Sequence, residues 1–194
     1  PPGQPYPTRE ITPVPSPLTT QTESSEAGSA AQHGAGEHEL RSFSLMALID
    51  ELAATRGPAA RIKGLHLDIH YDRALPVTIR ADEARLRRVL AALLDNAVRF
   101  TLRGSVTLCA SMVCDQLHIE VRDTGIGIER ERLETLFEAR VRPGEAVRED
   151  EGRAAASRLL AERMGGRLWA ESTPGEGSTF HVLLPLAEGG QPRV

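Results

Sequence analysis

Hydrophobic positions in the first half of the chain follow helical and strand spacing in turn. Apolar residues share one helical face over 43–56. The segment 66–71 alternates between apolar and polar residues as a strand does, and 77–80 predicts a second short strand. A longer apolar stripe over 82–100, with Asp82 at the N-cap position, predicts a helix with one buried face.

The second half of the chain predicts four strands and two helices. The strands lie at 104–113, 116–122, 167–172 and 178–185, and the helices lie near 129–138 and at 154–164. Strands adjacent in sequence are expected to pair, and the helices to gather on one face of the sheet. The predicted fold class is therefore an α/β two-layer sandwich with a mixed, mostly antiparallel sheet, and this order excludes a regular doubly wound nucleotide fold.

Composition separates the two ends of the chain from this patterned region. Seven of the 13 prolines fall within the first 17 positions, and a stretch rich in Thr, Ser, Gly and Ala follows. Such a segment buries too little apolar area to offset the entropy lost on ordering. We therefore expect a flexible linker at 1–40, one domain at 41–187 and a disordered tail at 188–194. A proline-rich recognition ligand is the alternative for the first segment.

Charge and cysteine content narrow the possible function classes. The net charge is −4 with a pI near 5.9, and acids lie among the basic residues, so we expect no nucleic-acid partner. No apolar run approaches the roughly 20 residues that span a bilayer. Cys109 and Cys114 have no His or Cys at ligand spacing. They predict no metal site and are interpreted as reduced thiols.

One polar residue interrupts the apolar face of the 82–100 helix. Asn96 lies among apolar residues, where a side-chain amide is costly unless it has a partner. Its oxygen could coordinate a hard cation such as a Mg²⁺ that bridges phosphates. Arg99, one turn further, could contact a phosphate. A structural hydrogen bond of Asn96 is the alternative.

A strand end followed by two glycines is more specific. The strand at 116–122 delivers Asp123 to its end, and Gly125 and Gly127 allow the backbone to turn tightly and approach a flat ligand. A buried carboxylate there can accept a hydrogen bond from an exocyclic amine, a charge-assisted bond worth roughly 1.5–3 kcal/mol. The alternative is an ordinary strand-to-helix turn with an Asp cap.

Together with the run from 164 to 185, these segments resemble the catalytic ATP-binding domain of sensor histidine kinases over about 43–186. Asn96 matches the asparagine box of that family, and Asp123-Thr-Gly-Ile-Gly matches its first glycine box. The stretch 177–185 matches its closing Gly-Ser-Thr-Phe…Leu-Pro signature. The resemblance implies a Bergerat-type ATP-binding fold. Related ATPases carry a general-base glutamate one turn before the asparagine, where this chain has Ala92, which argues against a water-activating ATPase.

The resemblance also implies roles for residues at matching positions. Asp123 would bind the adenine amino group, Gly125, Gly127, Thr179 and Phe100 would lie near the nucleotide, Asn96 would hold Mg²⁺, and Arg99 would reach a phosphate. ATP and Mg²⁺ are the implied cofactors, and the γ-phosphate would pass to a histidine by positioning and charge neutralisation.

The partners that the resemblance implies are dimerisation helices that carry the phosphoacceptor histidine, and a response-regulator receiver domain. The full-length protein would be a homodimer and the isolated domain a monomer. A cytoplasmic location is expected, including the cytoplasmic part of a membrane-bound sensor.

The stretch before the last helix departs from the family. The three glycines of its ATP lid fall on Glu149, Glu151 and Arg153. Those glycines let backbone amides surround the phosphates. Carboxylates beside a polyanion have the opposite effect, since two like charges about 4 Å apart repel by roughly 4 kcal/mol at an effective dielectric of 20. The sequence thus leaves two functions open: a working kinase domain, and a regulatory pseudokinase module with weak or no ATP binding.

Two further possibilities carry less support. His38-Glu-Leu-Arg41 echoes the phosphoacceptor box of the family, but it runs directly into the helix at 43–56 and leaves no room for a second hairpin helix. We interpret this match as a coincidence. An anti-sigma-type serine kinase shares the expected ATP-binding fold, but residues 164–185 have the sensor-kinase form.

Overall fold

The computed structural model describes residues 40–138 and 149–186, and for 149–151 only the backbone. In chain order its elements are β1 (Arg41–Phe43), α1 (Leu45–Ile62), β2 (His66–Tyr71), β3 (Ile79–Ala81), α2 (Glu83–Phe100), β4 (Ser105–Val113), β5 (Gln116–Asp123), α3 (Arg130–Thr135), α4 (Glu149–Arg163), β6 (Arg167–Thr173) and β7 (Gly177–Pro185).

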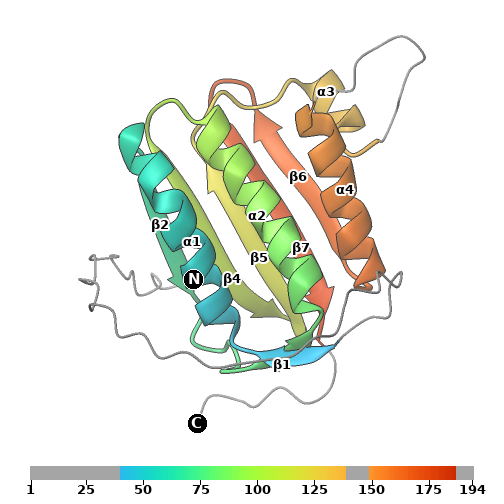
Figure 1. Cartoon of the computed structure of the whole chain (residues 1–194). Coiled ribbons are helices and arrows are strands. Elements are labelled where there is room, and N and C mark those ends of the chain that lie inside the picture. Colours follow the sequence, from blue (N-terminus) through green and yellow to red (C-terminus); the bar gives the residue numbers. More distant parts are fainter. Residues whose placement is uncertain (1–39, 139–148, 187–194) are drawn as a thin grey trace, which may run out of the picture.

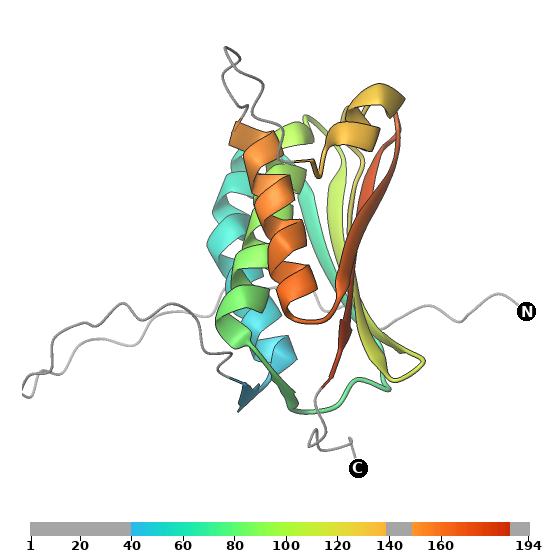
Figure 2. The same ribbon diagram turned by 90° about the vertical axis from the view of Figure 1, so that its right-hand side faces the viewer.

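Five strands form the main sheet in the order β2-β4-β5-β7-β6. The pair β2–β4 is parallel, and the other three pairs are antiparallel. The helices α1, α2 and α4 lie side by side across one face of this sheet (Figure 1), and the edge-on view separates the two layers (Figure 2). The predicted two-layer α/β sandwich with a mixed, mostly antiparallel sheet is confirmed.

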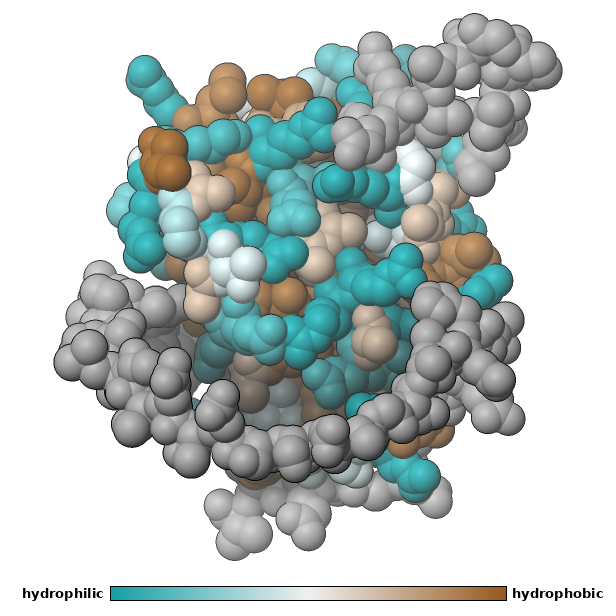
Figure 3. Space-filling model, viewed as in Figure 1, coloured by the Kyte–Doolittle hydropathy of each residue, from teal (hydrophilic) through white to brown (hydrophobic). Residues whose placement is uncertain are grey.

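Strand alternation and helix periodicity place the core between the layers. On β5, Leu117, Ile119 and Val121 are buried, while the residues between them point to the other face. The facing stripe of α2 is equally buried, and its fully buried leucines are Leu86, Leu90, Leu93 and Leu94. The outer side of the helices is mostly hydrophilic in Figure 3, as expected for amphipathic helices on a surface.

The prediction that adjacent strands pair throughout was wrong for β2 and β3. β3 instead pairs with β1 in a separate two-stranded sheet, in which Phe43 lies opposite Ile79. β1 was not predicted, because three residues are too few for a periodic signal. β2 pairs in parallel with β4. A parallel pair needs a long crossover connection, and α2 supplies it.

Two helices extend beyond their predicted limits. α1 continues past 56 to Ile62 and contains Pro58. The proline removes one backbone donor, but Pro58 and Ala54, the residue whose carbonyl loses its partner, are both exposed to water. α4 begins at Glu149 instead of 154. Acidic residues in a first turn complement the positive end of the helix dipole, which favours this earlier start.

The predicted N-cap at Asp82 is confirmed, and a two-residue turn joins β4 to β5. The side chain of Asp82 caps α2 by accepting a hydrogen bond from the backbone N–H of Arg85 at 2.9 Å. Cys114 and Asp115 join β4 to β5 with φ values of 47° and 62°. Two consecutive positive φ values are those of a type I′ hairpin turn, whose twist matches the flanking strands.

Candidate nucleotide-binding pocket

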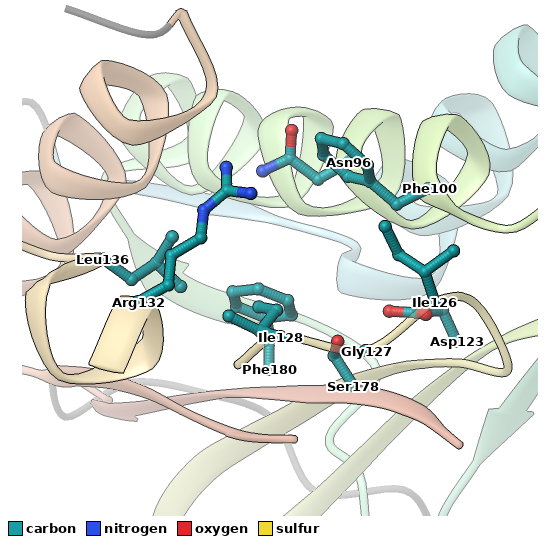
Figure 4. A pocket seen from close by; sticks show the side chains of 10 residues that line it. All are labelled: Asn96, Phe100, Asp123, Ile126, Gly127, Ile128, Arg132, Leu136, Ser178 and Phe180. Carbon is teal, nitrogen blue, oxygen red and sulfur yellow. The ribbon is translucent and has the colours of Figure 1, made fainter. Parts of the chain in front are cut away.

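A pocket opens between α2, the loop after β5, α3 and the inner side of β7 (Figure 4). Its lining consists of Asn96, Phe100, Asp123, Ile126, Gly127, Ile128, Arg132, Leu136, Ser178 and Phe180. The cavity measures about 490 Å³ including the space at its open mouth. A mostly apolar wall with a few polar groups is the usual composition of small-molecule sites.

α2 contributes Asn96 and Phe100, which lie one helical turn apart and therefore on the same face. Asn96 is only 7% exposed. Its Oδ1 is buried and has no hydrogen-bond partner among the residues that the structure describes. A buried acceptor without a partner costs about 1–3 kcal/mol. An amide oxygen is also a ligand that Mg²⁺ accepts, so this side chain fits the predicted metal-binding role.

β5 brings Asp123 to the opposite end of the pocket, where it is 6% exposed. The backbone N–H of Gly125 donates to Asp123 Oδ1 at 2.9 Å. Burial raises the pKa of the Asp123 carboxyl above its ordinary value, while hydrogen bonds from the backbone of Gly125 and Ser178 act in the opposite direction. A buried carboxylate is thus available to accept a further hydrogen bond from a ligand.

The loop after β5 is held against both sides of the pocket. The N–H of Ile126 donates to the carbonyl of Phe100 at 3.3 Å, and the carbonyl of Ile126 accepts from Gly175 at 2.8 Å. At Gly125 an added Cβ would lie 2.5 Å from the Phe100 carbonyl oxygen. Gly127 has φ +69°, and its Cβ would collide with the carbonyl of Thr173. Both glycines are therefore required by this backbone path.

The hydroxyl of Ser172 joins this loop to β7. Ser172 Oγ accepts from the N–H of Ile128 at 2.8 Å and donates to the carbonyl of Gly177 at 2.8 Å. It also lies 3.0 Å from Ser178 Oγ. This network fixes Ser178 beside Asp123 in the pocket wall.

The pocket lining contains four of the seven predicted nucleotide-binding residues, and Gly125, Arg99 and Thr179 lie outside it. Arg99 is exposed, and its guanidinium lies 5.4 Å from the ring centre of Phe100, at the rim instead of in the lining. The prediction for Thr179 does not agree with the geometry. Successive residues of β7 point to opposite faces, so Ser178 and Phe180 face the pocket and Thr179 faces away from it.

Sequence reasoning missed Arg132 and Leu136, which reach the pocket from the region of α3. They are four residues apart, so helical periodicity over 129–138 could have shown that they share a face. Figure 4 shows the guanidinium of Arg132 extending toward Asn96. The pocket therefore has a positive group next to its amide.

The predicted degenerate lid falls largely outside the described residues. Residues 139–148 and the side chains of Glu149 and Glu151 are not described. The backbone at 149–153 forms the first turns of α4, and Arg153 is exposed. The three positions that correspond to lid glycines are thus helical in this chain.

In this sandwich, α2 and the glycine loop enclose a buried carboxylate and a side-chain amide whose oxygen has no partner among the described residues, an arrangement that suits a nucleotide. Residues 81–188 match the family described as "Histidine kinase-, DNA gyrase B-, and HSP90-like ATPase". The chain belongs to this family, as the ATP-binding catalytic domain of the sensor histidine kinase type.

Individual relatives agree with that assignment. The sensor histidine kinase AruS of Pseudomonas aeruginosa is 38% identical over 154 residues, and the sensor protein GacS of Pseudomonas syringae pv. syringae is 34% identical over 153. These alignments cover 75% and 74% of this chain, which spans only 15% and 17% of the two relatives. The structure of full-length ShkA in complex with AMPPNP has a TM-score of 0.72 and 31% identity, and covers 82% of this chain and 34% of its own.

A nucleotide-free catalytic domain of the histidine kinase ThkA shares the fold, with a TM-score of 0.64, 22% identity and coverage of 76% of this chain and 95% of its own. None of the helices in the described ranges 40–138 and 149–186 has the length and apolar character needed to cross a membrane.

Proposed function

We propose that this chain binds Mg-ATP in the pocket between α2 and β7 and presents the γ-phosphate to a histidine on separate dimerisation helices. One observation carries the proposal: the buried carboxylate of Asp123 lines the same pocket as the Oδ1 of Asn96, which has no hydrogen-bond partner within the described ranges. The ShkA structure, 31% identical, is a complex with the ATP analogue AMPPNP, which supports the same ligand class here.

The carboxylate of Asp123 would accept a hydrogen bond from the exocyclic amine of adenine. Gly127 allows the backbone to lie close to the flat base, and Ile126, Ile128 and Phe180 supply apolar surface around it. Recognition of a single amine by one buried, charged acceptor is worth roughly 1.5–3 kcal/mol. This end of the pocket would therefore set the preference for adenine.

The opposite end would hold the phosphates. Asn96 would supply an oxygen ligand to Mg²⁺, which neutralises phosphate charge when it is bound. Arg132, which extends toward Asn96, and Arg99 at the rim would add positive charge there. The chain itself then contributes orientation and electrostatic stabilisation to the transfer of the phosphoryl group.

The partners follow from this role. We propose that the acceptor histidine lies on dimerisation helices of a homodimeric full-length protein, and that a response-regulator receiver domain takes the phosphoryl group onward. GacS, AruS and a "Hybrid signal transduction histidine kinase C" of Dictyostelium discoideum are named as signalling proteins, which supports this setting.

A second function is favoured by the start of α4. The helical backbone at 149–153 lacks the conformational freedom with which lid glycines wrap their amides around phosphates. The acidic positions Glu149 and Glu151 add unfavourable charge. A regulatory module that binds ATP weakly and transfers no phosphate is the function that this region supports.

Calorimetric titration of the chain with Mg-ATP separates the two functions. Micromolar binding that Asp123→Ala weakens by about tenfold or more supports the kinase domain. Binding that is millimolar or weaker, and that the triple change Glu149→Gly, Glu151→Gly and Arg153→Gly strengthens, supports the regulatory module. Asp95→Asn is the matched control, because Asp95 lies on α2 outside the pocket lining and pairs with Arg56 at 2.9 Å. If Asp123→Ala binds as tightly as the unchanged chain, the adenine site proposed here is wrong.

A further inference from the structure

A cluster of two imidazoles and one carboxylate lies on the outward face of the sheet, the face that points away from α1, α2 and α4 (Figure 2). His118 and Glu120 are two residues apart on β5, and His181 lies directly opposite Glu120 on β7. Residues two apart on a strand share a face, so the three side chains stand together. The pocket residues of the same strands, Asp123 and Ser178, point to the other side.

The three nearest ligand atoms form a compact triangle. His118 Nε2 lies 3.3 Å from His181 Nδ1, and His181 Nδ1 lies 3.4 Å from Glu120 Oε1. The third edge, from His118 Nε2 to Glu120 Oε1, is 3.8 Å. Neighbouring ligands of a tetrahedral zinc ion bound at ~2.0–2.1 Å are themselves about 3.3–3.4 Å apart. The triangle therefore has nearly the size of one face of a zinc site.

Side-chain rotations would complete the fit. The side chain of Glu120 is 31% exposed, so its carboxylate has room to shorten the longest edge. The two imidazole rings are within 6° of parallel, with centroids 5.4 Å apart. Imidazole lone pairs lie in the ring planes, so the rings would have to rotate out of this parallel arrangement for both lone pairs to point at one ion. No strand needs to move, because Glu120 and His181 are already paired across the sheet.

The ligand atoms of this cluster can converge on a cation. The facing nitrogens of the two imidazoles lie 3.3 Å apart, and each carries a proton or a lone pair according to the tautomer of its ring. In the tautomers that leave both nitrogens unprotonated, their lone pairs and the Glu120 carboxylate oxygen face one another. A cation at the centre would be attracted to all three atoms at once.

A neighbouring aromatic ring holds His181 in place. The ring of Trp169 on β6 stacks on His181 with centroids 4.9 Å apart and planes 10° apart. His181 Nε2 has no hydrogen-bond partner among the described residues. Coordination through Nδ1 places the ring proton on Nε2, for which the described residues offer no acceptor, so this tautomer costs part of the binding free energy.

We propose that His118 Nε2, His181 Nδ1 and Glu120 bind one divalent transition-metal ion, zinc in the first place, with water at the fourth position. Two imidazoles and a carboxylate suit Zn²⁺, whereas Mg²⁺ and Ca²⁺ prefer oxygen ligands alone. The site joins β5 to β7 and is separate from the nucleotide pocket, so it stands whether or not the chain binds ATP.

The primary test is titration of the full 194-residue chain, free of any affinity tag, with zinc chloride alone. The site predicts one tightly bound ion per chain. His118→Gln and His181→Gln each remove a ligand and are expected to lower zinc affinity by ~100-fold or more, since loss of merely an outer-sphere partner costs 10–100-fold. Glu120→Gln keeps a weak oxygen ligand and lowers affinity less. His66→Gln, an exposed histidine on β2 outside the cluster, is the matched control and keeps full affinity.

Trp169 provides an independent readout, because it is the only tryptophan in the chain. Cu²⁺ bound beside His181 is expected to quench the fluorescence of Trp169 at one equivalent. The His118→Gln change is expected to abolish this stoichiometric quenching. His181 is largely buried, and its substitution could impair folding. Circular dichroism checks each variant, and His118→Gln and Glu120→Gln carry the test by themselves.

Two results would overturn the proposal. One is wild-type zinc affinity in both His118→Gln and Glu120→Gln. The other is loss of zinc binding in Cys114→Ser, which would assign the ion to the exposed thiol of the hairpin instead of to the imidazole cluster.

Discussion

The two faces of β5 and β7 differ in how their polar side chains are arranged. Toward the helices, Asp123 and Ser178 are single polar side chains in a wall of apolar residues, and the carboxylate is almost completely buried. On the outward face, His118, Glu120 and His181 stand together and contact one another. The inner groups face a cavity, whereas the outer groups face each other.

The difference follows from strand alternation acting on one pair of strands. A shift of one residue in the β5–β7 register would exchange the two faces, so both arrangements depend on the same hydrogen-bonding pattern. The inner face presents isolated acceptors that a ligand can complete. The outer face presents ligand atoms whose spacing suits a single ion. Two chemically distinct sites can therefore share two strands without sharing a side chain.

The largest expected effect is the loss of nucleotide binding in Asp123→Ala. Removing a charge-assisted hydrogen bond worth roughly 1.5–3 kcal/mol lowers Mg-ATP affinity by about 10–150-fold. Zinc affinity should stay within about twofold, since Asp123 points to the other face. Calorimetric titrations with Mg-ATP and with zinc measure the two affinities. An equal fall in zinc affinity would show that the two faces are not independent.

The next largest effect is expected on stability, from Gly127→Ala. The new Cβ would collide with the carbonyl of Thr173, and φ is +69°. Strain of this kind costs about 1–3 kcal/mol, and Tm should fall by several degrees. Gly175→Ala is the matched control, because Gly175 also has positive φ, at +83°, but an added Cβ has no atom within 4 Å. Thermal denaturation that gives equal losses would assign the cost to φ alone and not to the close approach.

The sequence predicted the inner face far better than the outer one. Asn96 and Asp123 could be found because each interrupts a local apolar pattern, and the glycines after Asp123 indicate a tight turn. Ser178 was misassigned to its neighbour Thr179, because only strand alternation, fixed by the exact register, separates the two. The cluster of His118, Glu120 and His181 had no local signal, since β5 and β7 lie far apart in the chain and meet only through sheet pairing.

The same distinction applies to the fold. Long periodic elements such as α2, β4 and β5 could be predicted because each carries its own hydrophobic pattern. The three-residue strand β1 could not, because its length gives no period, and the pairing of β1 with β3 could not, because it is long-range. The extension of α1 through Pro58 depends on solvent around the exposed side of that helix, which the local sequence does not encode.

A smaller effect is expected when the hydroxyl that supports the inner face is removed. Ser172→Ala deletes the bonds to Ile128 and Gly177, at a cost of about 1–2 kcal/mol in unfolding free energy. Mg-ATP affinity should fall with it, because Ser178 and the glycine loop lose their connection. Ser111→Ala on the outward face of β4 is the control and should change neither quantity. Denaturant unfolding and calorimetry provide the two measurements, and unchanged affinity in Ser172→Ala would separate this network from the site.

The smallest expected effect concerns pH, because two backbone hydrogen bonds offset part of the burial of Asp123. Burial still raises the pKa of this carboxyl above its ordinary value of 3.8. Adenine binding needs the ionised form, so Mg-ADP affinity should weaken as pH falls through that raised pKa, at a pH where an exposed aspartate stays ionised. Without nucleotide, the unfolding free energy depends on pH in the opposite direction. The folded state binds the proton of Asp123 more tightly than the unfolded state, so the contribution of this carboxyl to stability falls as pH rises through the same window. Affinity measured from pH 8 to 5 tests the first statement, with Asp95→Asn as the control that keeps the wild-type profile. A profile in Asp123→Asn as steep as in the unchanged chain would assign the dependence to the phosphates and remove Asp123 from the adenine site.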